Sequence, residues 1–132
     1  MAALQTYGLV VGFFAGMAVN AAGASEKEHQ ERLCAGMELE KWTKQHTRVD
    51  CLSDEFAIEV DFSDSWADAI GQSLHYAHEF GRKAGIILIC KDTVKCTAHG
   101  YRLETTIKAF NLPITVWYCR TFDETLGDCV RD

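Results

Sequence analysis

Hydrophobic and polar residues alternate most clearly between residues 55 and 62. Large apolar side chains occupy every second position from Phe56 to Phe62, and the positions between them include Glu59 and Asp61. A period of two residues is typical of a β-strand, because successive side chains point to opposite faces of a sheet. The pattern therefore predicts a strand with one apolar face and one face that carries two carboxylates.

The next stretch has the period of a helix. Apolar residues recur at spacings of three and four: Trp66, Ile70, Leu74, Ala77 and Phe80. Ser63 or Asp64 can cap the start of such a helix, and Gly81 can end it. The spacing predicts an amphipathic helix over residues 63–80 that faces the core.

The remaining elements give the order of the fold. The continuous apolar run at 85–90 predicts a central strand that is buried on both faces. The other expected elements are a helix at 25–34, strands at 38–43 and 47–52, a helix at 101–110 and a strand at 114–118. Hairpin-linked strands followed by helical crossovers predict an α/β fold: a mixed sheet of αβββαβ order, flanked by helices, with a further helix and strand.

The N-terminal segment is apolar and uncharged. Residues 1–24 contain no Lys, Arg, Asp or Glu, and Ala22-Gly23-Ala24 has the small-x-small form that signal peptidase accepts. This predicts a signal peptide at 1–24, one domain at 25–132, and a periplasmic or secreted location. No Lys or Arg opens the segment, so an uncleaved N-terminal anchor is the alternative; after cleavage, no tight membrane association is expected.

All six cysteines follow the predicted leader. An even number of cysteines in a short exported chain indicates disulfides. A zinc site is the alternative, but the sequence lacks the CxxC and HxxxH spacings typical of one. Pairing of neighbours is plausible, with the other connectivities left open: Cys34 with Cys51, Cys90 with Cys96, and Cys119 with Cys129.

The net charge of −6 belongs entirely to the part of the chain after the leader. An acidic domain repels nucleic acid at long range, which argues against a tight, nonspecific nucleic-acid-binding protein. A weaker nucleic-acid partner is still compatible with this charge. A site built from carboxylates adds negative charge that a divalent cation would partly neutralise.

Two neighbouring strands carry acidic side chains that can act together. In the strand at 47–52, alternation places Asp50 on the face opposite Val49 and Cys51. Glu59 lies on the polar face of the next strand. Carboxylates on adjacent strands can share one divalent cation through oxygen ligands.

Gln72 and Tyr76 are four residues apart on the predicted helix, so they lie on one helix face beside these strands. An Asp on one strand, (D/E)-x-K on the next and Q-x-x-x-Y on the following helix resembles the pattern of RecB-type exonucleases and Holliday-resolvase-like members of the PD-(D/E)XK nuclease superfamily. Residues 48–52, 57–62 and 66–72 closely resemble a group of small exported bacterial proteins related to that superfamily. The resemblance spans most of the chain after the leader.

This resemblance implies a restriction-endonuclease-like core and a Mg²⁺- or Mn²⁺-dependent nuclease. Carried over residue by residue, Asp50 and Glu59 would bind the metal, and Gln72 and Tyr76 would position the motif or contact the nucleic-acid backbone. Asp61 is added to this candidate catalytic site as a further carboxylate ligand of the metal. An acidic residue on the first helix, Glu26 or Glu28, would be a further member.

The chain departs from the family pattern where the superfamily has a lysine that activates water and stabilises charge. Asp61 occupies that position, and Ser65 occupies a second position at which the exported group often carries lysine. A second metal held by Asp61 or a cation from elsewhere could replace it; the candidates are Arg48, Lys83, Lys91 and Arg102. The alternative function is an inactive nuclease-fold domain that serves as a binding or interaction module.

Overall fold

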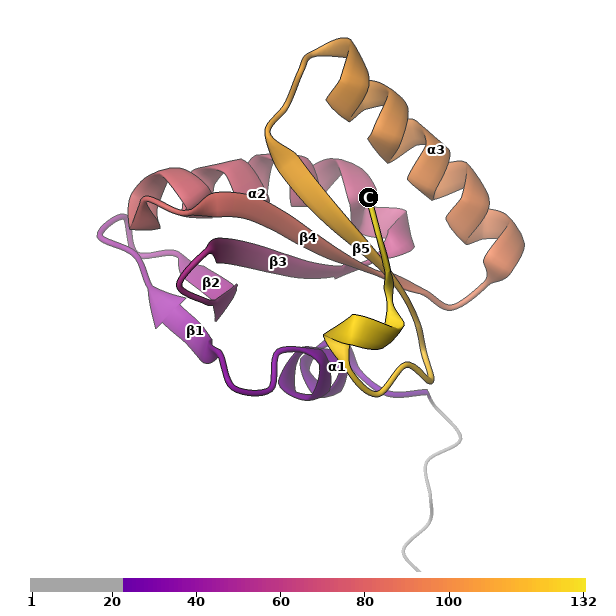
Figure 1. Ribbon diagram of the computed structural model, residues 1–132, viewed down its shortest axis with the longest axis horizontal. Helices are drawn as coiled ribbons and strands as arrows, with labels where there is room; N and C mark the ends of the chain where they lie inside the picture. The colour runs from indigo at the N-terminus through magenta and orange to yellow at the C-terminus, as the bar shows by residue number, and fades with distance from the viewer. Residues whose placement is uncertain (1–22) are drawn as a thin grey trace, which may run out of the picture.

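A six-stranded mixed sheet forms the centre of the computed structural model, which describes residues 23–132 (Figure 1). The predicted leader lies almost wholly outside these residues. The strands are β1 Glu38–Trp42, β2 Arg48–Leu52, β3 Phe56–Phe62, β4 Lys83–Cys90, β5 Ile114–Arg120 and β6 Val130–Arg131. The helices are α1 Glu26–Leu33, α2 Trp66–Phe80 and α3 Thr93–Ala109, with short 3-10 turns η1 Ser63–Ser65 and η2 Leu126–Asp128.

The strands lie in the sheet in the order of the chain. The pairs β1–β2 and β2–β3 are antiparallel, β3–β4 and β4–β5 are parallel, and β6 returns antiparallel to β5. The helices α2 and α3 are the two crossovers, and both cover one face of the sheet, whereas α1 and the C-terminal segment lie on the other (Figure 1). The predicted α/β class, with a mixed sheet and the order αβββαβαβ, is confirmed, and β6 is an addition.

The start of α3 was predicted too late. The helix begins at Thr93 rather than at residue 101, and the Asp92 side chain caps it by accepting a hydrogen bond from the Lys95 backbone N–H at 2.9 Å. The first turns escaped prediction because they show little apolar periodicity; Val94, for example, is 81% exposed. The cap, rather than hydrophobic burial, defines this end of the helix.

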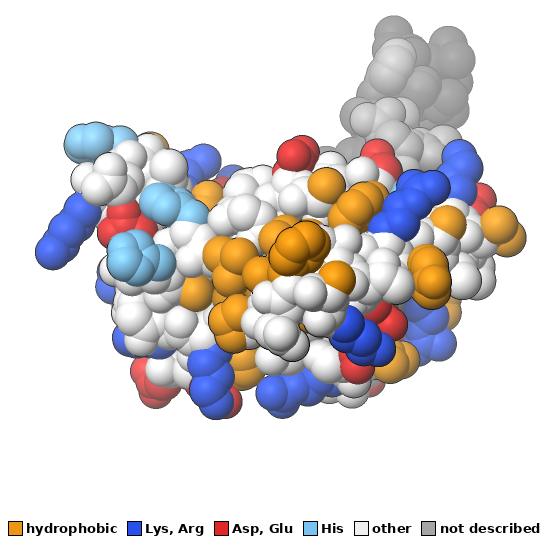
Figure 2. All heavy atoms as spheres, turned by 90° about the horizontal axis from the view of Figure 1, so that it is seen from above, with side chains coloured by type: hydrophobic (Ala, Val, Ile, Leu, Met, Phe, Trp, Pro, Cys, Tyr) orange, Lys and Arg blue, Asp and Glu red, His pale blue; other side chains and the backbone are white. Residues whose placement is uncertain are grey.

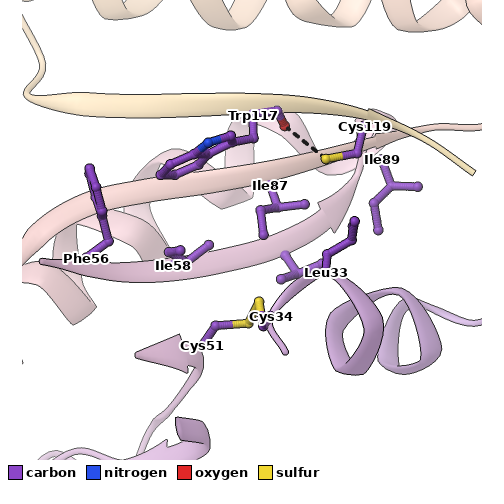
Figure 3. Packing of buried hydrophobic residues seen from close by; sticks show 10 residues of the cluster. Leu33, Cys34, Cys51, Phe56, Ile58, Ile87, Ile89, Trp117 and Cys119 are labelled. Atoms are coloured by element: carbon purple, nitrogen blue, oxygen red, sulfur yellow. Dashed lines mark hydrogen bonds between the residues drawn. A yellow bond between two sulfur atoms is a disulfide. The ribbon is translucent and has the colours of Figure 1, made fainter. Parts of the chain in front are cut away.

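Each face of the sheet has its own apolar core. Under α1, the core includes Leu33, Ile58, Ile87 and Trp117, as Figure 3 shows. On the other face, a second cluster packs beneath α2 and α3, around Ile86 and other buried residues. Seen from the α2–α3 side, further apolar side chains gather near the middle of the surface, with Lys and Arg side chains around them (Figure 2).

Three disulfides join neighbouring elements. They are Cys34–Cys51 between the end of α1 and β2 (Figure 3), Cys90–Cys96 between β4 and the first turn of α3, and Cys119–Cys129 between β5 and the C-terminal segment. These are the neighbour pairs, and they use all six cysteines, which rules out the zinc alternative for them. Three disulfides in a small domain fit an oxidising, extracytoplasmic compartment. Over residues 23–132, every helix is too short or too polar to cross a membrane.

Candidate functional site

The strands β2 and β3 pair only over a short stretch. Their register joins Cys51 with Ile58 and Leu52 with Ala57. Beyond this point the Asp50 side chain replaces the backbone pairing: its Oδ2 accepts a hydrogen bond from the Val60 backbone N–H at 2.8 Å. The two strands therefore part where the acidic residues begin, and a carboxylate fills the place of a backbone acceptor.

Asp50 is also fixed from the side of α1. The buried Gln30 side chain donates a hydrogen bond from its Nε2 to the Asp50 backbone carbonyl at 2.8 Å. The neighbouring Cys51 is joined to the end of the same helix by its disulfide with Cys34. Asp50 is thus held between α1 and β3, as a residue with a defined position in a site requires.

The predicted alternation in β2 is wrong at one position. Cys51 packs into the core under α1, as alternation requires, but Val49 packs with Tyr76 on the α2 side. Val49 and Cys51 therefore do not share the face opposite Asp50. On the neighbouring strand β1, Glu40 lies opposite Asp50 and has a positive φ of 51°, which interrupts the regular pleat at this place.

Four carboxylates meet near the point where β2 and β3 part. Glu59 and Asp61 are buried, with 5% and 8% of their surface exposed. Glu26, in the first turn of α1, lies within hydrogen-bonding reach of Asp61 and close enough to Asp50 to affect its charge. The other candidate on this helix, Glu28, is exposed, and its backbone N–H is bonded to the Ser25 cap. Glu26 is therefore the acidic residue that joins the cluster.

Burial is the largest cause of a raised pKa for all four carboxylates, and their mutual charges raise the pKa of Glu59 and Asp61 further. Burial, followed by the charges of Asp50 and Asp61, raises the pKa of Glu59 to about 10. Burial, followed by the charge of Glu26, raises the pKa of Asp61 to about 7. Burial also raises the pKa of Asp50 and of Glu26. The largest charges acting on Glu59 and Asp61 are thus all negative, and at neutral pH the cluster favours binding a proton or a cation.

Two oxygens in the cluster lack a donor. Glu59 Oε2 and Asp61 Oδ2 are buried and accept no hydrogen bond from any residue in 23–132. Carboxylate oxygens are the ligands that Mg²⁺ and Mn²⁺ prefer, so the donor chemistry fits such an ion. Within the described part of the chain, however, no group of three or more His, Cys, Asp or Glu side chains has the arrangement needed to hold a metal. A cation would require the side chains to turn toward a common point.

Of the two predicted helix residues, Tyr76 is brought to the cluster. Tyr76 is buried, and its pKa is raised to about 12 by burial first and then by the charges of Glu59, Asp50 and Asp61. Gln72 is half-buried one turn earlier on α2. Its side chain makes none of the hydrogen bonds formed within residues 23–132, so its role in the site stays a prediction.

The predicted cations lie in different places. The charge of Arg48 partly offsets the rise that burial causes in the pKa of Asp50. Its guanidinium lies 5.2 Å from the centre of the Trp42 ring. Lys83 pairs with an exposed glutamate at the start of β4, the opposite end from the cluster. Lys91 extends over the ring of Phe62, 3.7 Å from its centre. Arg102 is exposed on α3.

One polar pair next to the cluster was not predicted. The buried Ser63 hydroxyl, two residues after Asp61, is 2.9 Å from Nδ1 of His99 on α3. Neither residue belongs to a local motif, because the contact depends on how α3 packs against η1. Sequence spacing alone gives no signal for such a pair.

Comparison with known proteins found no matching family model, no similar curated protein and no similar solved structure. The interpretation of the site therefore depends on its residues and on their geometry.

Proposed function

We propose that this protein is an exported, divalent-metal-dependent nuclease of the PD-(D/E)XK type, which hydrolyses phosphodiester bonds in nucleic acid. One observation carries the proposal: Asp50 on β2 and the buried Glu59 and Asp61 on β3 gather where the two strands part, with donorless oxygens on Glu59 and Asp61. The order αβββαβ at the start of the fold is also the order that the resemblance implies.

Each carboxylate has a separate part in this proposal. Asp50 uses Oδ2 to bind the Val60 backbone, which leaves Oδ1 for a cation. Glu59 and Asp61 would contribute the oxygens that now lack a donor. A Mg²⁺ or Mn²⁺ ion would supply positive charge against the phosphodiester and acidify the attacking water.

The surrounding residues would orient the substrate. The Tyr76 hydroxyl is close enough to the carboxylates for their charges to raise its pKa, so it can donate a hydrogen bond to a phosphate oxygen or to water. Arg48 lies on the exposed side of Asp50 and can attract a phosphate group. Three disulfides support the exported location.

A binding module without catalysis is the second candidate. The observation that favours it is the lack of a lysine at positions 61 and 65, together with the negative charges that dominate the surroundings of Glu59 and Asp61. In that case the acidic cluster would be a remnant of a metal site, and the fold would serve to bind nucleic acid or another partner.

The test is a nuclease assay of the purified, oxidised protein on single- and double-stranded DNA and RNA, with Mg²⁺ or Mn²⁺. Glu59→Gln is expected to lower the rate by about a hundredfold or more, since it removes a metal ligand. The matched control is Glu55→Gln, which changes an exposed carboxylate at the other end of the strand. Activity that survives Glu59→Gln would rule out the proposed site.

A gain-of-function variant separates the two candidates. Ser65→Lys restores a lysine at the start of α2. Cleavage by the wild-type protein that increases in this variant supports the nuclease. Cleavage by Ser65→Lys alone identifies the natural protein as the binding module. Calorimetric titration with Mn²⁺ reports metal binding in every variant independently of turnover.

A further inference from the structure

A hollow in the surface lies outside the carboxylate cluster. Its volume is about 810 Å³, and it is bounded by the ends of β4 and β5, the first half of α3 and the segment that follows β5. Because β3, β4 and β5 are parallel, their carboxyl ends share one edge of the sheet, so the hollow lies at the same edge as Asp61, near the end of β3. This is the edge at which open α/β sheets usually bind ligands, and the volume suits a small molecule.

Aromatic rings line this hollow. Tyr101 and Phe122 are 71% and 70% exposed, and they come from α3 and from the segment after β5. The Arg120 guanidinium lies 4.5 Å from the centre of the Phe122 ring, within cation–π distance. Tyr118 lies against Gly100, where an added Cβ would stand 3.1 Å from the tyrosine ring. Exposed flat rings around one hollow suit stacking on a flat ligand.

Positive charge is available in the same hollow. Arg120 is paired with Asp123 at 2.7 Å. Lys91 makes none of the ion pairs formed within residues 23–132. Its ammonium lies over the ring of Phe62, the residue that follows Asp61. An unpaired ammonium in this place can attract a phosphate group.

Two polar side chains, Tyr118 and Glu104, also line the hollow. The Tyr118 hydroxyl itself is buried, and burial, followed by the charge of the adjacent Glu104, raises the pKa of this phenol. The Glu104 carboxylate can only accept hydrogen bonds. A ligand with an amino group on a flat ring would match Glu104, as the exocyclic amine of cytosine matches a glutamate.

We infer that this hollow is a nucleotide-binding site: the base stacks on Tyr101 and Phe122, its amino group faces Glu104, and its phosphate faces Lys91. The inference goes beyond the proposed nuclease activity, because none of the cluster carboxylates lines the hollow. The nucleotide is either free or one unit of a single strand. Both sources present the same base and phosphate.

The test is an NMR titration of the oxidised full chain with CMP and with UMP, in EDTA and at low salt. CMP is expected to bind at least severalfold more tightly than UMP, because Glu104 accepts a hydrogen bond from an amine and repels a carbonyl. Tyr101→Ala and Phe122→Ala are expected to weaken CMP binding about tenfold each. The control is Phe110→Ala, an equally exposed aromatic residue (73%) at the other end of α3.

Two further variants separate the polar contacts. Glu104→Gln is expected to remove the preference for CMP over UMP, since an amide can also donate to a carbonyl. Lys91→Ala is expected to weaken CMP binding to the level of cytidine, which lacks the phosphate. The inference is overturned if CMP gives no saturable shifts, or if Phe110→Ala weakens it as much as Phe122→Ala.

A further comparison tests whether the ligand is a free nucleotide or a unit of a single strand, and a variant of the cluster separates this inference from the nuclease proposal. A short oligo(dC) that binds at least tenfold more tightly than CMP identifies a strand as the ligand, whereas equal affinities identify the free nucleotide. Glu59→Gln is expected to leave CMP binding unchanged. If the wild-type protein binds CMP but does not cleave nucleic acid, only the nuclease proposal is overturned. If it cleaves nucleic acid but does not bind CMP, only this inference is overturned.

Discussion

The two faces of strand β3 are equally buried but chemically opposite. On the face toward α1, Phe56, Ile58 and Val60 pack into an apolar core. On the face toward α2, Glu59 and Asp61 are buried among other carboxylates, and an oxygen of each lacks a hydrogen-bond donor. The first face stabilises the fold by excluding water, whereas the second costs free energy because burial disfavours the ionised form of its carboxyl groups.

We therefore assign the apolar face to the stability of the fold and propose the acidic face as the one that serves function. A buried group that destabilises its own protein is typical of a functional site, where binding of a proton, cation or substrate compensates the cost. The apolar face would tolerate similar apolar substitutions. At neutral or higher pH, replacing Glu59 or Asp61 by an uncharged residue would remove the cost of burying an ionisable carboxyl group.

The largest expected effect comes from the apolar face. Ile58→Ala removes a fully buried side chain and is expected to lower the free energy of unfolding by about 3 kcal/mol. Urea denaturation of the oxidised protein measures this change. Val94→Ala, at an 81% exposed position, is the control and is expected to change the free energy by less than about 0.5 kcal/mol. Similar losses in both variants would contradict the assigned core.

The acidic face is expected to make stability fall as pH rises. The pKa of Glu59 is raised from 4.5 to about 10 and that of Asp61 from 3.8 to about 7, so above pH 4.5 the folded protein holds protons that the unfolded chain has released. The contribution of these two groups to stability is therefore largest below about pH 4. It is lost progressively as the pH rises to their pKa values in the folded protein, about 7 for Asp61 and about 10 for Glu59. Between pH 5 and 8 we expect a loss of about 2 kcal/mol or more.

Urea denaturation at fixed ionic strength across this pH range measures the slope. Glu59→Gln is expected to flatten it and to increase stability at pH 8, since the variant has no carboxyl to ionise at this position. Saturating Mn²⁺ is expected to do the same for the wild-type protein if the cluster binds the metal. A wild-type stability that rises from pH 5 to 8 would mean that the cluster is not protonated in the folded state.

A close approach on the apolar side gives a smaller effect. An added Cβ at Gly85 would lie 2.9 Å from the Trp117 ring and 3.1 Å from Ile58. Gly85→Ala is therefore expected to cost about 1 to 2 kcal/mol. At Gly71, in the middle of α2, an added Cβ meets nothing within 4 Å, so Gly71→Ala is expected to stabilise the helix by up to about 1 kcal/mol. Melting temperatures that shift in the same direction would contradict this contrast.

The smallest expected effect tests the electrostatics of the acidic face. The charge of the exposed Asp68 on α2 contributes to the raised pKa of Asp61. Asp68→Asn is expected to lower the pKa of Asp61 by a fraction of a unit, which carboxyl NMR titration can resolve. Asp54→Asn, at an exposed position before β3, is the control and is expected to leave that pKa unchanged.

The same strand shows what could be predicted from the sequence. Alternation from Phe56 to Phe62 identified β3 and its two faces, because a period of two can be recognised without knowledge of the fold. The neighbouring carboxylates Asp50 and Glu59 followed from the same pattern. The packing of Val49 on the α2 side did not, because it departs from the strict alternation on which the prediction depended.

Contacts between distant segments lay beyond sequence reasoning for a related reason. The pair Ser63–His99 forms through the packing of α3 against η1, and the hollow around Tyr118 forms where α3 and the segment after β5 meet. The disulfide pairing could be predicted in part. Their neighbour pairing was plausible from spacing, but only the fold selects it from the alternatives.

The Cys34–Cys51 disulfide links the formation of the acidic site to the oxidation of the protein. It joins the end of α1, the helix that carries Glu26 and Gln30, to β2, the strand that carries Asp50. Its formation therefore holds together two elements that contribute carboxylates to the cluster. A newly made chain in a reducing compartment lacks this crosslink. The enzyme we propose would therefore mature only after export, and the cell's own nucleic acids would be protected from it during synthesis.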